Sequence, residues 1–129
     1  MTQSKSFVAL QLSEKTLQAV RDMGFTEPTS IQEQTIPPMM AWRDVIAKAP
    51  TGTGKTCAFG IPIIEHLEDG RHGIQALILS PTRELAIQIS EDIEQLASSR
   101  PEVKVVTLYG GQPLNRQVAQ LREKPQIVV

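Results

Sequence analysis

The chain has 129 residues, a formal net charge of −1 and 21% charged residues. This length allows one domain, and the balanced charge excludes a protein that binds nucleic acid through bulk positive charge. A single cysteine, Cys57, excludes an intrachain disulfide and is typical of a reducing compartment, so we expect a cytoplasmic protein. The sequence offers no signal peptide and no apolar run of spanning length, so we expect no membrane partner.

The first part of the chain, residues 1–43, predicts two helices. The first covers 13–23, with its leading serine as the N-cap and Gly24 placed to end it. A turn over 25–32 opens the second helix, which the two prolines at 37–38 are expected to interrupt.

A short apolar run over 44–49 predicts a strand, and it leads into the sequence Ala-Pro-Thr-Gly-Thr-Gly-Lys-Thr over 49–56. A strand, a glycine loop and a helix in this order are typical of a phosphate-binding loop. Gly52 and Gly54 let the backbone turn its N–H groups inward, and the helix N-terminus adds partial positive charge. The stretch therefore predicts a site for a nucleoside phosphate.

Two residues at the end of this loop are the catalytic candidates. Lys55 is expected to reach the β- and γ-phosphates, and the Thr56 hydroxyl is expected to ligate Mg²⁺. The general pattern has glycine where Ala49 stands, so the loop matches the pattern at every defined position except this one. A glycine-rich turn without function is the alternative interpretation.

The remaining chain alternates helix and strand. The helix after the loop is expected to reach about residue 67, with Pro62 as a kink or an early stop. The run 75–79 is apolar without alternation, which is typical of a parallel strand covered on both faces. Further elements are expected as a helix over 80–97 with Leu85, Ile89, Ile93 and Leu96 as its core stripe, strands over 103–109 and 126–129, and a helix over 113–121. Alternating elements with short loops predict an α/β fold with a parallel sheet.

Taken together, four stretches resemble the DEAD-box family of RNA helicases. Residues 24–32, Gly-Phe-Thr-Glu-Pro-Thr-Ser-Ile-Gln, resemble the adenine-reading motif of that family, with its isolated upstream aromatic at Phe7. The loop 49–56 has the family's A-x-T-G-x-G-K-T form, which accounts for its leading alanine. The stretch 81–86, Pro-Thr-Arg-Glu-Leu-Ala, and the glycine pair 110–111 match motifs that contact RNA in the family.

The resemblance implies a RecA-like, P-loop parallel sheet with helices on both faces, incomplete at the C-terminus. It implies that 1–43 recognises adenine and that 44–129 carries the phosphate loop and the RNA-contacting βα units. The implied ligands are ATP with Mg²⁺, and RNA gripped by its backbone without sequence specificity. The implied nucleotide-binding residues are Phe25, Glu27, Gln32, Thr51, Gly52, Thr53, Gly54, Lys55 and Thr56, and the implied RNA-binding residues are Pro81, Thr82, Arg83, Gly110 and Gly111.

Gln32 has two interpretations. Its carboxamide offers a donor and an acceptor side by side, which complements N7 and N6 of adenine. It also fits a helix capping box together with Thr29. The resemblance favours the adenine contact, in which case Ser30 and Glu33 would supply the cap and Phe25 would stack on the adenine ring.

Other residues also have structural alternatives. Arg83 is expected to contact RNA phosphate, but an ion pair with Glu84 or another carboxylate would explain it as well, and the glycines at 110–111 would also suit a simple turn. His66 and His72 lack a second ligand at metal spacing and are expected at the surface. Core packing is the structural alternative for Phe7, and Cys57 is expected to pack in the interior.

The sequence departs from the family at Pro50, which replaces the usual Gln and removes one backbone donor. It also stops before the family's T-P-G-R and D-E-A-D motifs and before the second, C-terminal RecA-like domain. We therefore expect the full-length protein to be an ATP-dependent RNA helicase that separates short duplexes, and the 129-residue chain to be inactive alone. A related DNA helicase and a non-catalytic nucleotide- or RNA-binding fragment are the alternatives.

In RecA-like sheets, the strand that leads into the phosphate loop is flanked by strands from later in the chain, and these are expected beyond residue 129. The strand over 44–49 should lack its normal neighbours, so Val45, Ile46 and Ala47 should face solvent or a foreign partner. Unpaired strand edges with apolar faces recruit other chains, and we expect the isolated chain to self-associate or to remain partly molten.

Overall fold

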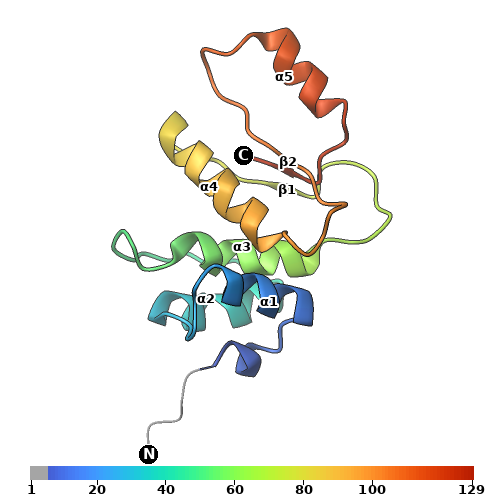
Figure 1. Ribbon diagram of the computed structural model, residues 1–129. Helices are drawn as coiled ribbons and strands as arrows, with labels where there is room; N and C mark the ends of the chain where they lie inside the picture. Colours follow the sequence, from blue (N-terminus) through green and yellow to red (C-terminus); the bar gives the residue numbers. More distant parts are fainter. Residues whose placement is uncertain (1–5) are drawn as a thin grey trace, which may run out of the picture.

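The computed structural model describes residues 6–129 (Figure 1). Helices and strands alternate from the middle of the chain onward, as the α/β prediction requires. The elements in chain order are the 3₁₀ helix η1 (Phe7–Leu10), α1 (Glu14–Asp22), α2 (Ser30–Met40), α3 (Lys55–His66), β1 (Ala76–Leu77), α4 (Arg83–Leu96), β2 (Val105–Val106), α5 (Leu114–Leu121) and β3 (Ile127–Val128).

The three strands form one parallel sheet in the order β1-β3-β2. β3 is the central strand, and its Ile127 lies opposite Ala76 of β1 and Val105 of β2. Backbone bonds extend the ladders past the short strands, since Ile78 N donates to the Val128 carbonyl at 2.9 Å. The parallel sheet expected from the sequence is confirmed, with shorter strands than the apolar runs predicted.

The layers stack in one direction across the molecule. Figure 1 shows α4 between the sheet and α3, with α1 and α2 beyond α3 and with α5 on the far side of the strands. α3 and α4 approach closely at Gly60, where an added Cβ would lie 2.8 Å from the terminal methyl carbons of Ile93 and Leu96. The best-buried side chains belong to this stack: Ile36, Ile61, Ile64, Ile93, Leu96 and Ile127.

A partly buried polar cluster connects three distant parts of the chain. Glu65 of α3 accepts hydrogen bonds from the Ser13 amide at 3.1 Å, from the Ser13 hydroxyl at 2.7 Å, and from the Thr16 hydroxyl. Arg100, which follows α4, places Nη2 3.2 Å from Glu65 Oε1 and donates to both hydroxyls. Burial favours the protonated form of Glu65, but these hydrogen bonds and the Arg100 charge outweigh it and hold the pKa of the carboxyl below its usual value.

Helix ends follow the local signals in the sequence. Ser13 caps α1 by accepting from the Thr16 amide, and Thr82 caps α4 by accepting from the Leu85 amide. Gly24 has a φ of +88° just past α1, as expected for a residue that ends a helix. These helices form where short-range hydrogen bonds satisfy their free N–H groups.

The expected interruption of α2 by two prolines is wrong. The helix continues through Pro37 and Pro38 to Met40, and just past its end Ala41 N donates to the Pro37 carbonyl at 3.1 Å. Proline removes its own amide donor but keeps a helical φ, so a helix held by packing tolerates it near its end. α3 likewise runs through Pro62 to His66 without stopping there.

The strand expected over 44–49 does not form. Val45 and Ile46 are 37% and 98% exposed, and Ala47 is exposed as well. The described chain contains no strand that pairs with this segment, so its backbone has no ladder to join. The exposure of these three residues was expected, whereas the strand itself was not found.

Two expectations about apolar faces are also wrong. Leu77 and Leu79 are 65% and 85% exposed, so the run 75–79 is covered on one face only, with Ala76 and Ile78 packed against the core. Leu85 of the predicted α4 stripe is 38% exposed, whereas the other three stripe residues are buried.

Within 6–129, none of the helices is long and apolar enough to cross a membrane.

Candidate functional site

The phosphate loop has the backbone geometry that its glycines suggested. Gly52 and Gly54 have φ values of +84° and +79°, in the left-handed region that other residues avoid. The Thr53 hydroxyl donates to the Pro50 carbonyl at 2.6 Å and closes the turn, so it faces its own loop. The loop is therefore a preformed turn that delivers the chain into α3.

The start of α3 lacks a side-chain cap. Gly54 is the N-cap residue and makes no side-chain hydrogen bond to the helix, in contrast to the capped starts of α1, α2 and α4. The free N–H groups of the first turn are a favourable site for phosphate oxygens. Lys55 is exposed and Thr56 is partly exposed at this point, as a contact with phosphate and metal requires.

A pocket of about 600 Å³ joins this loop to two other elements. Phe25 from the turn after α1 and Gln88 and Asp92 from α4 face into it. The expected nucleotide-binding residues that line it are Phe25, Thr51, Gly52, Gly54, Lys55 and Thr56. The structure thus brings the aromatic residue and the phosphate loop into one cavity of the size that holds a small-molecule ligand.

Gln32 lies beneath the loop and does not line this pocket. It is fully buried, and its Oε1 accepts from the Thr29 amide at 2.9 Å while Thr29 Oγ1 accepts from the Gln32 amide at 3.4 Å. The capping box is therefore Thr29 with Gln32, and the alternative in which Ser30 caps α2 is wrong. Gln32 Nε2 also donates to the Gly54 carbonyl at 3.2 Å, which connects α2 directly to the phosphate loop. One N–H and one acceptor lone pair of the carboxamide remain for another partner.

Asp92 is a pocket residue that the sequence did not single out. Burial and the nearby charge of Glu91 raise the pKa of Asp92, and a hydrogen bond from Thr56 opposes that rise. The sequence feature that could have identified Asp92 is its position three residues after Ile89, beside the buried stripe of α4. Cys57 is buried, as expected, and this burial, with a smaller contribution from Asp92, raises the pKa of its thiol to about 12.

A second cluster forms where α4 begins and β2 ends. The Arg83 guanidinium carbon lies 5.4 Å from the ring centroid of Tyr109, and Nη2 lies 3.0 Å from the position that a Cβ on Gly111 would take. Gly111 has a φ of +90°. Among residues 6–129 no ion pair of Arg83 with Glu84 or another carboxylate is found, so that alternative is not supported. Tyr109 was missed because a single aromatic residue at a strand end carries no pattern.

The other expected site residues take different positions. Pro81 and Gly110 are exposed beside the Arg83 cluster, and the oxygen of Thr82 is engaged in capping α4. Glu27 is exposed and lies outside the pocket of the phosphate loop. Phe7 is 6% exposed and packs in the core, which was its structural alternative.

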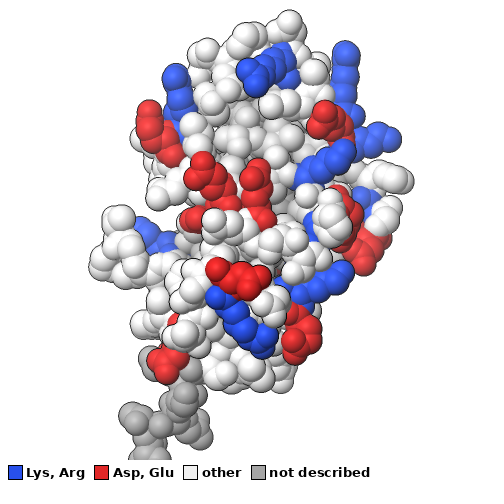
Figure 2. All heavy atoms as spheres, in the orientation of Figure 1, with Lys and Arg blue, Asp and Glu red and all other residues white. Residues whose placement is uncertain are grey.

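The two clusters lie on the same side of the molecule. Figure 1 shows that α3 and α4 both begin on the left, the side toward which the strands run. On the face in Figure 2, basic and acidic side chains are interspersed and acidic ones gather over α4. The acidic side chains over α4 would repel a polyanion from this part of the surface.

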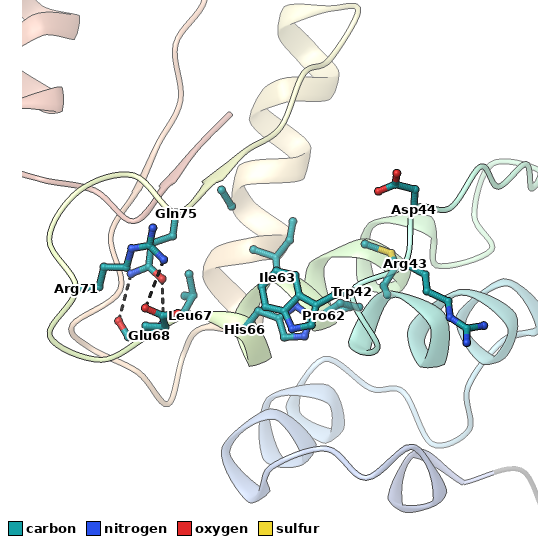
Figure 3. A pocket seen from close by; sticks show the side chains of 12 residues that line it. Trp42, Arg43, Asp44, Pro62, Ile63, His66, Leu67, Glu68, Arg71 and Gln75 are labelled. Atoms are coloured by element: carbon teal, nitrogen blue, oxygen red, sulfur yellow. Dashed lines mark hydrogen bonds and ion pairs between the residues drawn. The ribbon is translucent and has the colours of Figure 1, made fainter.

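A smaller pocket of about 260 Å³ lies away from the phosphate loop (Figure 3). Its wall includes Trp42 and His66, whose rings stack with centroids 3.8 Å apart, and His66 Nε2 donates to the Met40 carbonyl at 3.2 Å. His66 is therefore half-buried, which corrects its expected surface position, whereas His72 is exposed. Within the described residues, no group of three or more His, Cys, Asp or Glu side chains is placed to hold a metal ion.

A parallel sheet with an open glycine loop at the start of a packed helix defines the class of P-loop nucleotide-binding proteins. The sequence profile described as DEAD/DEAH box helicase matches residues 29–129. The chain belongs to this family, and its α/β fold is the RecA-like fold of the family.

Several relatives show how much of a helicase the chain represents. It is 49% identical over 123 residues to the ATP-dependent RNA helicase CshA of Limosilactobacillus reuteri, which covers 95% of this chain and 24% of that protein. The structure of a DEAD box protein from Methanococcus jannaschii is similar with a TM-score of 0.89 and 42% identity, covering 96% of this chain and 34% of that one. The RNA helicase Prp28 from Chaetomium thermophilum, bound to ADP, is similar with a TM-score of 0.83 and 37% identity, over 96% of this chain and 31% of that one. The chain thus spans about a quarter of the length of the curated relative.

Proposed function

We propose that this chain is the ATP-binding and RNA-contacting part of a longer ATP-dependent RNA helicase. The observation that carries the proposal is the position of two clusters at one side of the fold. The pocket of the phosphate loop brings Phe25 to Lys55 and Thr56, and the second cluster gathers Arg83 and Gly111. A related helicase, Prp28, is known with ADP bound, which supports a nucleotide in the first site.

The residues of the first site fit ATP with Mg²⁺. The uncapped first turn of α3 offers N–H groups to phosphate, and Lys55 is free at the surface to meet phosphate charge. Thr56 would be the protein ligand of Mg²⁺, which supplies charge neutralisation at the phosphates when it is bound. The fit rests on a small donor set of the kind that suits Mg²⁺, which takes few protein ligands and relies on phosphate oxygens.

In the second site, Arg83 and the exposed glycines would hold the RNA backbone. Glycine lets a sugar-phosphate chain approach closely, and a guanidinium pairs with phosphate through two N–H groups. Contacts of this kind carry no base sequence, so we propose that the RNA is bound without sequence preference. The C-terminal RecA-like domain of the longer protein would be the partner that closes on both ligands.

The test is ATP hydrolysis by the full-length protein and its Lys55→Ala variant, with RNA or DNA present. We expect RNA to stimulate the wild-type rate and DNA to leave it unchanged, and we expect Lys55→Ala to keep less than about a tenth of the rate. Stimulation by DNA would favour a DNA helicase. A rate in Lys55→Ala close to that of wild type would remove the phosphate role of the loop.

A second experiment separates the two interpretations of Gln32. We expect ATP to bind about tenfold or more tightly than GTP, and Gln32→Ala to lose most of that preference. Thr29→Ala is the matched control, because it removes the hydroxyl of the same capping box and leaves the carboxamide in place. Competition titrations that show equal ATP-to-GTP ratios in wild type and Gln32→Ala would assign Gln32 to the cap alone.

A further inference from the structure

We propose that Tyr109 is a positioning residue that holds the Arg83 guanidinium ready for an RNA phosphate. This inference rests on the proposed function, because it takes Arg83 as an RNA contact. The contact that carries it is the cation–π arrangement, with the Arg83 guanidinium carbon 5.4 Å from the centroid of the Tyr109 ring.

The kind of contact matters for a residue that must bind phosphate. An ion pair would engage the N–H groups of Arg83 with a carboxylate, and it would have to break before RNA binds. The ring of Tyr109 attracts the charge of the guanidinium without accepting its N–H donors as a carboxylate would. Arg83 is exposed and is thereby held in place with donors available to a bidentate phosphate contact.

Tyr109 is itself fixed from two sides. Gln112 Nε2 donates to the Tyr109 hydroxyl at 2.6 Å, and Gln117 Nε2 of α5 donates to the Tyr109 carbonyl at 3.1 Å. Gln117 Nε2 also donates to the Gln112 carbonyl at 3.4 Å. The ring is therefore a half-buried, braced platform, and α5 supports it although none of its own residues is buried.

Gly111 also lies close to the Arg83 guanidinium. A Cβ at this position would come 3.0 Å from Nη2, and the φ of +90° disfavours any residue with a side chain. Arg83 thus lies close to both the ring and the glycine. Fixing a long side chain before binding removes part of the entropy that its ordering would otherwise cost.

The experiment is a double-mutant cycle in the full-length protein. The probe is a fluorescently labelled single-stranded polyuridine, titrated with Mg²⁺ and a non-hydrolysable ATP analogue present, and the readout is the dissociation constant. We expect Tyr109→Leu to weaken RNA binding by about two- to fivefold, the size of a cation–π contact at an exposed site. Tyr109→Phe keeps the ring and should recover most of that loss. In an Arg83→Ala background, Tyr109→Leu should have no further effect.

Controls separate this role from a loss of folding and from bulk charge. Arg122→Ala removes the same charge from the loop before β3, at the opposite end of the strands, and should change RNA affinity less than Arg83→Ala. A structural defect in Tyr109→Leu would lower the melting temperature and would persist in the Arg83→Ala background.

The outcomes distinguish the two proposals. Additive losses in the cycle, unchanged affinity in Tyr109→Leu, or tighter binding in that variant would each overturn the positioning role while leaving Arg83 as an RNA contact. Unchanged affinity in Arg83→Ala would instead remove Arg83 from the proposed function, and the role of Tyr109 with it.

Discussion

The helical stack and the strand layer of this molecule differ in how completely they bury their apolar side chains and pair their backbone polar groups. α1, α2, α3 and α4 bury a shared apolar core, and the Glu65 cluster joins the start of α1, the end of α3 and Arg100 after α4. In the strand layer, by contrast, Leu77 and Leu79 are exposed and the segment 44–49 pairs with nothing in the described chain. The contrast teaches that helices capped locally can complete themselves, whereas a strand is stable only with neighbours.

The largest expected effect comes from breaking the helical side at its partly buried ion pair. Glu65→Ala leaves the Arg100 charge without its carboxylate and removes the acceptor of the Ser13 hydroxyl, and we expect a loss of about 2–3 kcal/mol in unfolding free energy. The measurement is urea unfolding of the 129-residue chain at high dilution, followed by circular dichroism. Glu68→Ala is the matched control, because its ion pair with Arg71 is exposed and is worth less than about 1 kcal/mol. Equal losses in both variants would refute a special role for the buried pair.

A smaller effect is expected where α3 and α4 touch. Gly60→Ala would place a methyl group 2.8 Å from the terminal methyl carbons of Ile93 and Leu96, so these side chains or the helices must shift. Overpacking of this kind costs about 1–3 kcal/mol. Gly110→Ala adds the same group where no atom lies within 4 Å and should be tolerated in the same unfolding assay. A Gly60→Ala protein as stable as wild type would show that the contact between α3 and α4 accommodates the extra methyl group without cost.

The Glu65 cluster also predicts a pH dependence. Its folded pKa lies below the ordinary value of 4.5, so the carboxylate contributes its full stabilisation above that value. The contribution is lost as the pH falls through the lowered folded pKa. The difference in unfolding free energy between wild type and Glu65→Gln should therefore be constant near neutral pH and should shrink in acid. A difference that grows on acidification would have the wrong sign for a lowered pKa.

The sequence predicted best what local hydrogen bonds decide. The cap at Ser13, the helix end at Gly24 and the left-handed glycines of the phosphate loop were all predicted from nearest-neighbour chemistry. It failed at Pro37, because tertiary packing carries α2 past a missing donor, and at 44–49, because a strand depends on segments far away in the chain.

The candidate site divides in the same way. The loop and Phe25 were anticipated from contiguous motifs, and the structure gathers them in one pocket. The contacts of Asp92 with Thr56 and of Tyr109 with Arg83 join residues more than twenty positions apart, where no spacing rule applies. The Glu65 cluster is similar, since it links residue 13 to residue 100. Polar contacts between residues this far apart in the sequence can be identified only from the three-dimensional structure.

The smallest change in stability is expected on the strand side, together with a clear change in association. In the isolated 129-residue chain, Leu77→Lys combined with Leu79→Lys should alter unfolding free energy by less than about 1 kcal/mol, because both side chains are already exposed. The same change should reduce self-association, since charge on an exposed edge strand opposes pairing with other chains. Ile78→Lys is the control on the same strand, and it should destabilise the chain because Ile78 packs against the core. Light scattering and sizing over a concentration series measure the effect. A wild-type chain that stays monomeric throughout, with a cooperative melt, would show that the strand layer is as self-sufficient as the helices.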